Sequence, residues 1–527
     1  MTRPAPATGI AAAPAELLAA LADAPPAAWL ERGRALALNG DLGAAAALLE
    51  AALARAPDDA ELRLALASAH WQLGDLARAD AELDALLGDR PDHVAAAFAL
   101  ARLRAGQGRV RAAEAALRTP FARIRQPSDL TVRAARMLAG WGRTAAAAEI
   151  CEAQIALGDD DARLRVYAGL LLLKLGEFER SRERYRGAIE RDPSMLEFDA
   201  AYAIAAARRY VDPADADIGW FERLLARPQL GSRARASLRF ALGKIHDDLG
   251  EWARAAAYFR AANALVDRGG WSRKSWRRVV DVRMNAAPLP SRRPAAGEGV
   301  PVFVVGAPRS GTTLVAELLA RSDQVRNRGE LDQLPELAQQ LARVVRPDAA
   351  RLDAIAAAYW RELRQDDADA GWFIDKQPLN FLNLDLIAAL FPQAHVVYCR
   401  RSSRDTALSI WMQHFESAEY RFAYDFDDIG AVLQGAARLL AKARRDARVR
   451  LHEVRYEALV AAPEAVVGEL AAALGLAPFD CGAPARAATA IGTASVWQAR
   501  QPVYTRAVGR WRAYAEFVPE LRRFADD

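Results

Sequence analysis

Two different patterns of hydrophobic and polar positions divide the chain. In the first half, helical stretches are interrupted by glycine at a constant interval of 34 residues. After Gly299, short runs of β-branched and aromatic residues alternate with longer helical stretches. The first pattern predicts repeated helix pairs, and the second predicts a parallel sheet covered by helices on both faces. We therefore expect an α-solenoid followed by an α/β domain.

The glycines of the first half mark predicted turns between paired helices. They are Gly40, Gly74, Gly108, Gly142, Gly176 and, after a longer interval, Gly250. Small residues recur seven positions before and five positions after each glycine, which lets two helices cross closely. Because glycine adopts positive φ without strain, it ends the first helix of each pair. The period resembles that of the tetratricopeptide repeat over roughly residues 27–265, with one longer, irregular unit near residues 197–233.

Two uses of this array stay open. A superhelix of helix pairs offers a concave surface on which a peptide or a protein binds. The array otherwise serves as a scaffold, or it pairs two copies of the chain in a homodimer. The Pro/Gly-rich stretch 286–299 lacks periodicity and predicts a linker. The expected parts are an N-terminal segment (1–26), the repeat solenoid (27–285), the linker (286–299) and the α/β domain (300–527).

Charge and composition narrow the functional classes. The formal net charge of 71 − 67 = +4 is too small for a general nucleic-acid binder, so anion sites must come from local clustering. The three cysteines are widely separated and include no C-x-x-C pair, which indicates neither a disulfide framework nor a zinc site. Prolines interrupt any signal-peptide core, and no apolar run reaches membrane-spanning length. We expect a cytoplasmic protein without a membrane span.

A strand, a glycine-rich turn and a helix start follow one another early in the second half. Val302–Val305 predicts a buried strand, and Gly306 and Gly311 keep the outer spacing of a nucleotide-binding P-loop. The backbone N–H groups and helix dipole of such a turn attract an anion. However, Thr312 stands where the P-loop has lysine, which disfavours ATP hydrolysis. Arg309 beside two threonine hydroxyls suits a smaller charged group such as a phosphosulfate.

Further candidates lie at the ends of other predicted strands. The strands are expected near residues 302–305, 372–374, 394–399 and 449–456, and the residues at or just past their ends are Arg309, Lys376, Arg401 and Tyr456. Because the carboxyl ends of parallel strands meet at one edge of a sheet, we expect these side chains to gather there. An ion pair with Asp375 at a helix entry is the alternative role for Lys376.

A second anion pocket is predicted after the third of these strands. Arg401 follows the strand directly, and Ser409 lies about two turns into the next helix. The guanidinium fork and the free N–H groups of the first helical turn suit a phosphate. Two anion sites at two strand ends imply a nucleotide with phosphates at both ends of its ribose.

These two motifs resemble those of sulfotransferases. Ala307–Leu314 looks like their 5′-phosphosulfate loop, and Tyr398–Ser409 looks like their 3′-phosphate motif. The chain is similar over about residues 300–515 to the protein-tyrosine sulfotransferase family, including its bacterial tetratricopeptide-containing relatives. The resemblance implies a P-loop-like parallel-sheet domain that uses 3′-phosphoadenosine 5′-phosphosulfate as co-substrate without a metal, and an acceptor hydroxyl such as that of a protein tyrosine.

The resemblance also implies roles for single residues. Glu330, at 309 + 21, matches the family's catalytic base, and Lys376 matches the lysine that stabilises the leaving nucleotide, with Arg309 at the sulfuryl end. The implied donor-binding residues are Arg309, Ser310, Gly311, Thr312, Thr313, Arg401, Ser409, Tyr456, Ser495 and Arg500. Gln413 stands where the eukaryotic pattern has a basic residue, and Gln501 stands where it has a lysine.

Other functions remain alternatives at this point. The acceptor is a peptide tyrosine, a carbohydrate or a small alcohol, and the motifs do not choose among these. A kinase with a degenerate P-loop is disfavoured by Thr312. A non-catalytic repeat scaffold is disfavoured because Glu330, Lys376 and Arg309 occur together. Since every expected nucleotide contact lies beyond Gly299, deletion of residues 1–285 is expected to leave donor binding intact.

Overall fold

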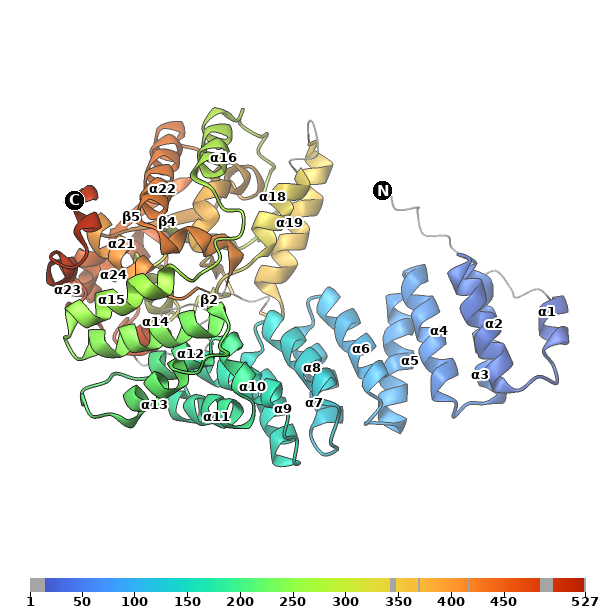
Figure 1. Ribbon diagram of the computed structural model, residues 1–527. Helices are drawn as coiled ribbons and strands as arrows, with labels where there is room; N and C mark the ends of the chain where they lie inside the picture. The colour runs from blue at the N-terminus through green and yellow to red at the C-terminus, as the bar shows by residue number, and fades with distance from the viewer. Residues whose placement is uncertain (1–14, 342–346, 368–369, 416, 484–495, 526–527) are drawn as a thin grey trace. The chain divides into compact units, whose positions relative to one another are not determined.

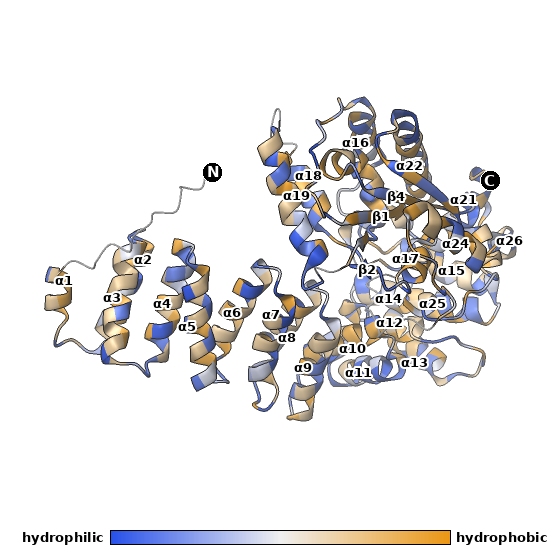
Figure 2. Ribbon diagram, turned by 180° about the vertical axis from the view of Figure 1, so that it is seen from behind, coloured by the Kyte–Doolittle hydropathy of each residue, from blue (hydrophilic) through white to orange (hydrophobic). Residues whose placement is uncertain are grey.

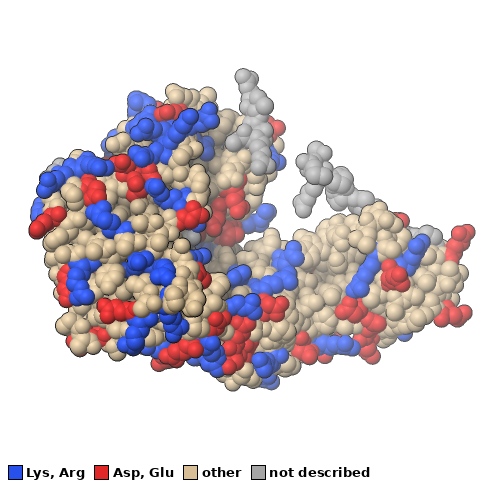
Figure 3. Space-filling model, in the orientation of Figure 1, with Lys and Arg blue, Asp and Glu red and all other residues tan. Residues whose placement is uncertain are grey.

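The computed structural model describes residues 15–341, 347–367, 370–415, 417–483 and 496–525. The chain divides into two compact units, Met1–Asp159 and Asp160–Asp527. Basic and acidic side chains are interspersed on the face shown in Figure 3, as the small net charge leads one to expect. Among the helices of the described ranges, none has the length and apolar content needed to cross a membrane.

The first unit is a row of helices that pack in consecutive pairs (Figure 1). Its helices are α1 (Ala15–Ala20), α2 (Pro26–Leu38), α3 (Leu42–Arg55), α4 (Ala60–Leu73), α5 (Leu76–Asp89), α6 (Val94–Gly106), α7 (Val110–Phe121), α8 (Ser128–Gly140) and α9 (Thr144–Ala156). Hydrophobic and hydrophilic residues alternate along these ribbons (Figure 2), because one face of each helix packs on its neighbours.

The glycine pattern has the structural cause that the sequence predicts. Gly74 ends α4 with a φ of 85°, and the side chain of Asp75 then caps α5 by accepting a hydrogen bond from the Arg78 N–H. Gly33 shows why small residues recur, since a Cβ atom there would lie 2.7 Å from the Leu49 side chain. The first unit is thus the expected helical repeat array.

The second unit begins with further helix pairs. These are α10 (Ala162–Leu175), α11 (Phe178–Arg191), η1 (Pro193–Phe198), α12 (Ala200–Ala206), α13 (Ala216–Leu225), α14 (Ser232–Asp248), α15 (Trp252–Asn263) and α16 (Arg273–Asn285). The irregular unit expected near residues 197–233 contains η1, the short helix α12 and α13.

A five-stranded parallel sheet follows, as predicted. Its strands are β1 (Val300–Gly306), β2 (Val325–Asn327), β3 (Trp372–Asp375), β4 (His395–Arg400) and β5 (Arg450–Arg455), in the spatial order β2-β3-β1-β4-β5. All four neighbouring pairs are parallel. The central strand β1 therefore places its carboxyl end between those of β3 and β4, where ligands bind in open α/β sheets.

Helices connect and cover the strands. They are α17 (Thr312–Leu319), α18 (Gln333–Leu341), α19 (Ala349–Arg364), η2 (Pro378–Asn383), α20 (Leu384–Leu390), α21 (Ser403–Trp411), η3 (Ala418–Tyr424), α22 (Phe426–Asp446), α23 (Tyr456–Ala461), α24 (Pro463–Leu474), α25 (Val496–Ala499), α26 (Trp511–Tyr514) and η4 (Pro519–Arg523). Alternate residues of β1 face opposite sides, with Val302 and Val304 in one hydrophobic cluster and Phe303 and Val305 in another.

The last repeat helices share the core of the sheet domain. Phe240 of α14 and Phe259 of α15 are fully buried in the same cluster as Phe303 of β1. Polar contacts reinforce this packing, because Asp247 of α14 accepts a hydrogen bond from Tyr514 Oη at 2.6 Å and pairs with Arg510. Helices α14 and α15 are consequently structural parts of the α/β domain rather than a separate solenoid end.

The segment 286–299 has neither helix nor strand, as a linker would, but it is attached to the domain that follows. The Arg292 backbone N–H donates to the Ala389 carbonyl at 3.0 Å. The Nε of its guanidinium donates to the Leu390 carbonyl, and the Nη2 pairs with Glu298. Arg292 is only 8% exposed. This segment therefore belongs to the packed surface of α20.

Candidate functional site

The turn between β1 and α17 has the shape of an anion cradle. Arg309 has a φ of 68° and Gly311 a φ of 101°, both in the left-handed region. A Cβ atom on Gly311 would lie 2.8 Å from the Tyr456 ring. Left-handed residues that bring successive N–H groups to one side form an anion-binding concavity, and backbone strain of this kind is common at functional sites.

Buried hydroxyls line this turn. Ser310, Thr312 and Thr313 are 2%, 4% and 8% exposed, at the start of α17. Within the described residues, the Ser310 Oγ has no hydrogen-bond partner. A buried hydroxyl without a partner is costly, and a phosphate or sulfate oxygen would satisfy it. The cradle and this hydroxyl fit the 5′ end of a phosphosulfate nucleotide.

The second predicted pocket lies directly beside the first. Arg309 Nε donates a hydrogen bond to Ser409 Oγ of α21 at 3.1 Å. Arg401, at the end of β4, donates through Nη1 to the Arg309 carbonyl at 3.0 Å and through Nη2 to the Ala507 carbonyl at 2.6 Å. Its guanidinium also lies over the Tyr456 ring, 4.7 Å from the centroid. The structure thus brings Arg309, Arg401, Ser409 and Tyr456 together.

The electrostatics of this cluster favour an anionic ligand. Burial lowers the pKa of the Arg309 guanidinium, and the charge of Arg401 lowers it further. Burial likewise lowers the pKa of Arg401, whose Nε has no hydrogen-bond partner among the described residues. Two half-buried cations side by side repel each other, so a phosphate between them would relieve the repulsion and occupy the remaining donor.

The third predicted group lies at the ends of β2 and β3. The Lys376 N–H donates to the Gly329 carbonyl at 2.7 Å, which holds the segment after β2 along the end of β3. The Lys376 ammonium, 3% exposed, lies 2.5 Å from Glu330 Oε1. The structure therefore pairs Lys376 with Glu330. Asp375 instead accepts hydrogen bonds from Tyr359 Oη and from Asn380 Nδ2 at 2.9 Å.

The buried carboxyl of Asp375 predicts a pH-dependent stability. Asp375 is 1% exposed, and burial raises its pKa to about 7, although the Tyr359 hydrogen bond opposes this. The folded chain thus binds more protons than the unfolded chain between about pH 4 and 7. We expect the free energy of unfolding to fall by about 2–3 kcal/mol from pH 5 to 7 through this group.

Urea unfolding at several pH values measures this effect. The Asp375→Asn variant keeps an oxygen that accepts from Tyr359 but cannot ionise, so its unfolding free energy should lack this fall between pH 5 and 7. Parallel pH profiles for the variant and the original chain would show that Asp375 does not titrate in this range.

Two further predicted donor-binding residues belong to the C-terminal part of the chain. Ser495 lies outside the described residues. Arg500 lies against the turn between α10 and α11, where a Cβ atom on Gly176 would be 3.1 Å from Arg500 Nε. Trp497 packs on Phe178 of the same turn, with ring centroids 4.6 Å apart. Arg500 nevertheless acts electrostatically on Glu317 of α17, whose pKa is raised by burial and lowered by Arg500.

The structure also places residues at the site that carry no sequence motif. Tyr202 of α12 accepts a hydrogen bond from Gln413 Nε2, close to Arg309. Tyr420 lies on the other side, where its hydroxyl donates to Gln377 Oε1 at 3.4 Å. Burial raises the pKa of Tyr420, and the charge of Glu330 raises it further. The resemblance to sulfotransferases marks Gln413 as an unusual position, but only the fold brings Tyr202 to it.

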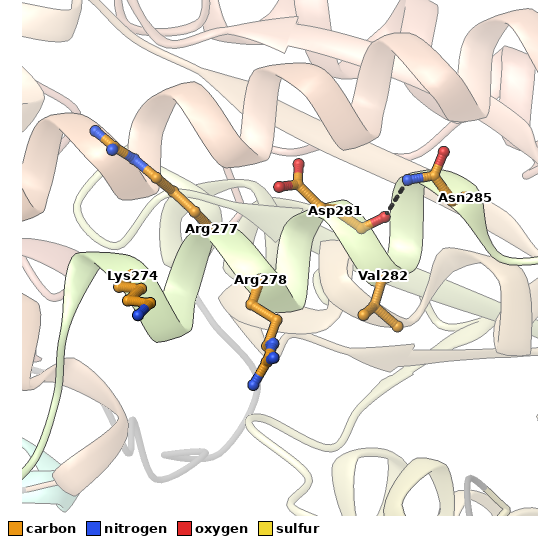
Figure 4. Close-up of a pocket in the computed structure, with 6 residues that line it drawn as sticks. All are labelled: Lys274, Arg277, Arg278, Asp281, Val282 and Asn285. Atoms are coloured by element: carbon orange, nitrogen blue, oxygen red, sulfur yellow. Dashed lines mark hydrogen bonds between the residues drawn. The ribbon is translucent and has the colours of Figure 1, made fainter.

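The arrangement provides two anion-binding clusters and a carboxylate–ammonium pair at adjacent strand ends. Within the described ranges, no group of three or more His, Cys, Asp or Glu side chains is placed to hold a metal ion. A separate open hollow lies on the surface of α16 (Figure 4), lined by Lys274, Arg277, Arg278, Asp281, Val282 and Asn285. None of the predicted site residues lines it.

Known proteins of two kinds are similar to this chain. Residues 301–480 match the model of the sulfotransferase family, and residues 36–97 match that of the tetratricopeptide repeat. An uncharacterized protein from Aquifex aeolicus (strain VF5) is 26% identical over 404 residues, which cover 70% of this chain and 51% of the relative. The chain thus spans about half the length of this curated relative.

Solved structures include both kinds. The sulfotransferase domain of the Synechococcus PCC 7002 olefin synthase is 20% identical, with 45% of this chain and 98% of that chain covered and a TM-score of 0.32. The sulfotransferase domain from the curacin biosynthetic pathway is 19% identical, with 44% and 99% covered and a TM-score of 0.32. YrrB, a repeat protein with an unusual peptide-binding site, is 16% identical, with 40% and 96% covered and a TM-score of 0.24. The chain therefore carries a tetratricopeptide repeat and, at residues 301–480, a sulfotransferase-family domain.

Proposed function

We propose that the chain moves a sulfuryl group from 3′-phosphoadenosine 5′-phosphosulfate to an acceptor hydroxyl, and that the acceptor is a protein tyrosine. The observation that carries the donor assignment is the contact between the two anion-binding motifs. Arg309 of the loop after β1 donates to Ser409 of the helix after β4 at 3.1 Å. A nucleotide with phosphate groups at both ends of its ribose would occupy both motifs at once.

The residues divide into two donor-binding groups. The turn from Gly306 to Thr313 would hold the 5′-phosphosulfate through its N–H groups and the hydroxyls of Ser310, Thr312 and Thr313. Ser409 Oγ and the free Nε of Arg401 would hold the 3′-phosphate. The Tyr456 ring beneath the Arg401 guanidinium fixes the plane of that group.

The donor supplies an activated sulfuryl group whose bridging oxygen gains negative charge as transfer proceeds. The Lys376 ammonium is held at the end of β3 by burial and by its contact with Glu330, and would neutralise that charge. Glu330 is an accessible carboxylate, with a side chain 22% exposed, and would accept the proton of the acceptor hydroxyl. The acceptor oxygen would approach the sulfur from the side opposite the leaving oxygen.

The acceptor assignment rests on the repeat array and on the family resemblance. Repeat arrays present concave surfaces to extended peptides, and an unfolded segment that carries a tyrosine would suit both such a surface and a site that contains Glu330. In this proposal the array holds the acceptor protein, and the reaction takes place in the cytoplasm. Use of the array for pairing two chains would leave the chemistry unchanged.

A transfer assay with three acceptor classes tests the acceptor. The full chain and the phosphosulfate donor are incubated with a tyrosine peptide, a carbohydrate or a small alcohol, and mass spectrometry detects the added sulfuryl group. The tyrosine peptide should be modified, and a control peptide with phenylalanine in place of tyrosine should not. Modification of only the carbohydrate or the alcohol would contradict the tyrosine assignment while supporting sulfuryl transfer.

A further inference from the structure

A repeat helix contributes a side chain to the candidate donor site. Helix α12 carries Tyr202, whose hydroxyl oxygen accepts a hydrogen bond from Gln413 Nε2. We propose that the Tyr202 hydroxyl donates a hydrogen bond to the 3′-phosphate of the donor nucleotide. This inference rests on the proposed function, and it makes the irregular repeat unit a part of the donor-binding site.

The position of Tyr202 follows from a short chain of contacts. Arg309 Nε donates to Ser409 Oγ at 3.1 Å. Gln413 lies four residues after Ser409, at the end of α21, where the helical backbone continues through Met412. The Gln413 N–H donates to the Ile410 carbonyl at 3.0 Å, which holds Gln413 against the last turn of the helix that carries Ser409. Tyr202 also acts electrostatically on Arg309, so its hydroxyl lies near the donor cluster. Gln413 is 6% exposed, and its amide reaches Tyr202.

The hydrogen-bond inventory of the Tyr202 hydroxyl leaves one donor. Its oxygen accepts from Gln413 Nε2. A phenol has one O–H donor besides its acceptor capacity. Within the described residues, the Tyr202 O–H donates no hydrogen bond. A half-buried O–H without an acceptor, beside an arginine, suits an anionic oxygen.

The hydroxyl also keeps its proton at neutral pH. Burial raises the pKa of Tyr202 to about 12, and the charge of Arg309 opposes the rise. Tyr202 is therefore a neutral donor. Arg309 and Arg401 already place two half-buried cations in the cluster, and a third cation there would add repulsion. The neutral Tyr202–Gln413 pair supplies hydrogen-bond donors without that repulsion.

The ring of Tyr202 is fixed by packing that does not depend on the hydroxyl. It lies edge-on to Phe240 and His414, with centroid distances of 6.0 and 5.9 Å. The Tyr202 backbone N–H donates to Ser237 Oγ of α14 at 3.2 Å. A Tyr202→Phe substitution thus removes the donor and keeps the packing.

Calorimetric titration of the full chain tests this role. The ligands are adenosine 3′,5′-bisphosphate and adenosine 5′-monophosphate, and the readout is the ratio of their affinities. Tyr202→Phe should weaken bisphosphate binding about tenfold, the effect of losing one hydrogen bond to a charged group, and leave monophosphate binding within about twofold. Tyr258→Phe is the matched control, because that half-buried ring of α15 stacks on His246 of α14, and it should change neither affinity.

The outcomes separate this inference from the proposed function. Equal affinities for the two nucleotides in the unmodified chain would contradict the proposed donor itself. A bisphosphate preference that Tyr202→Phe retains in full would overturn only the role of Tyr202. Thermal unfolding shows whether Tyr202→Phe folds. If it does not, Gln413→Met is used instead, because methionine lacks the amide N–H that holds the Tyr202 hydroxyl in place. Retention of the full preference in Gln413→Met would equally overturn the role.

Discussion

Replacement of Glu330 by glutamine should lower turnover by about 10²–10⁴-fold and leave donor affinity nearly unchanged. The glutamine keeps the shape of the side chain, and its amide oxygen can still accept from Lys376 Nζ. It cannot take a proton from the acceptor hydroxyl. The loss should therefore appear in the rate of the chemical step, measured in single-turnover experiments, while calorimetry shows the same affinity for the bisphosphate nucleotide.

Asp332→Asn is the matched control for this variant. Asp332 is an exposed carboxylate two residues after Glu330, and its charge reaches the same tyrosine, Tyr420. If the acidic residues act only through their negative charge, turnover should fall in both variants. If Glu330 is a specific base, a large loss of turnover should appear only in Glu330→Gln. Near-normal turnover in Glu330→Gln would assign the proton transfer to another residue.

Deletion of residues 1–285 should abolish folding, whereas deletion of residues 1–159 should leave a folded chain. The longer deletion removes Phe240, Phe259 and Trp276 from the core that packs on β1. Truncation of a single buried phenylalanine costs about 3–5 kcal/mol, and the whole stability of a domain is about 5–15 kcal/mol. It also leaves Tyr514 and Arg510 without Asp247. The shorter deletion removes a unit that is compact by itself.

Thermal unfolding of both truncated chains, with and without the bisphosphate nucleotide, measures this difference. The chain that begins at residue 160 should unfold cooperatively and be stabilised by the nucleotide. Cooperative unfolding of the chain that begins at residue 286 would show that α14 and α15 are dispensable. The shorter truncation also tests acceptor binding by the array, because it should raise the KM for a protein acceptor more than the KM for a small phenol.

Much of the fold is predictable from local pattern. The 34-residue glycine period and the four apolar strands correspond to the repeat helices and to β1, β3, β4 and β5. Strand β2, Val325–Asn327, was not predicted, because three residues are too short for a periodic signal. Its pairing with β3 sets the position of the segment that carries Glu330. The base candidate was thus identified by resemblance, and its placement needs the sheet.

Strand topology alone predicts only those site residues that come after the end of a strand. Lys376 and Arg401 follow β3 and β4 directly, and Arg309 lies in the turn after β1, so parallel topology alone brings them to one edge. Tyr202 lies more than 200 residues from Gln413 and carries no motif, so only tertiary packing reveals it. Ligand contacts alone predict that donor binding survives deletion of residues 1–285, whereas the hydrophobic core that α14 and α15 share with the sheet predicts loss of the fold.

Calorimetric titration of the full chain with adenosine 3′,5′-bisphosphate and with ATP plus magnesium tests the donor assignment most directly. In the proposed donor complex, the adjacent clusters at Arg309 and at Arg401 would each hold a phosphate, one at each end of the ribose. The bisphosphate should bind at least about a hundredfold more tightly than ATP, since the second cluster supplies several charge-assisted hydrogen bonds. Tighter binding of ATP, together with magnesium-dependent ATP turnover, would contradict the sulfotransferase assignment and favour a phosphoryl-transfer enzyme.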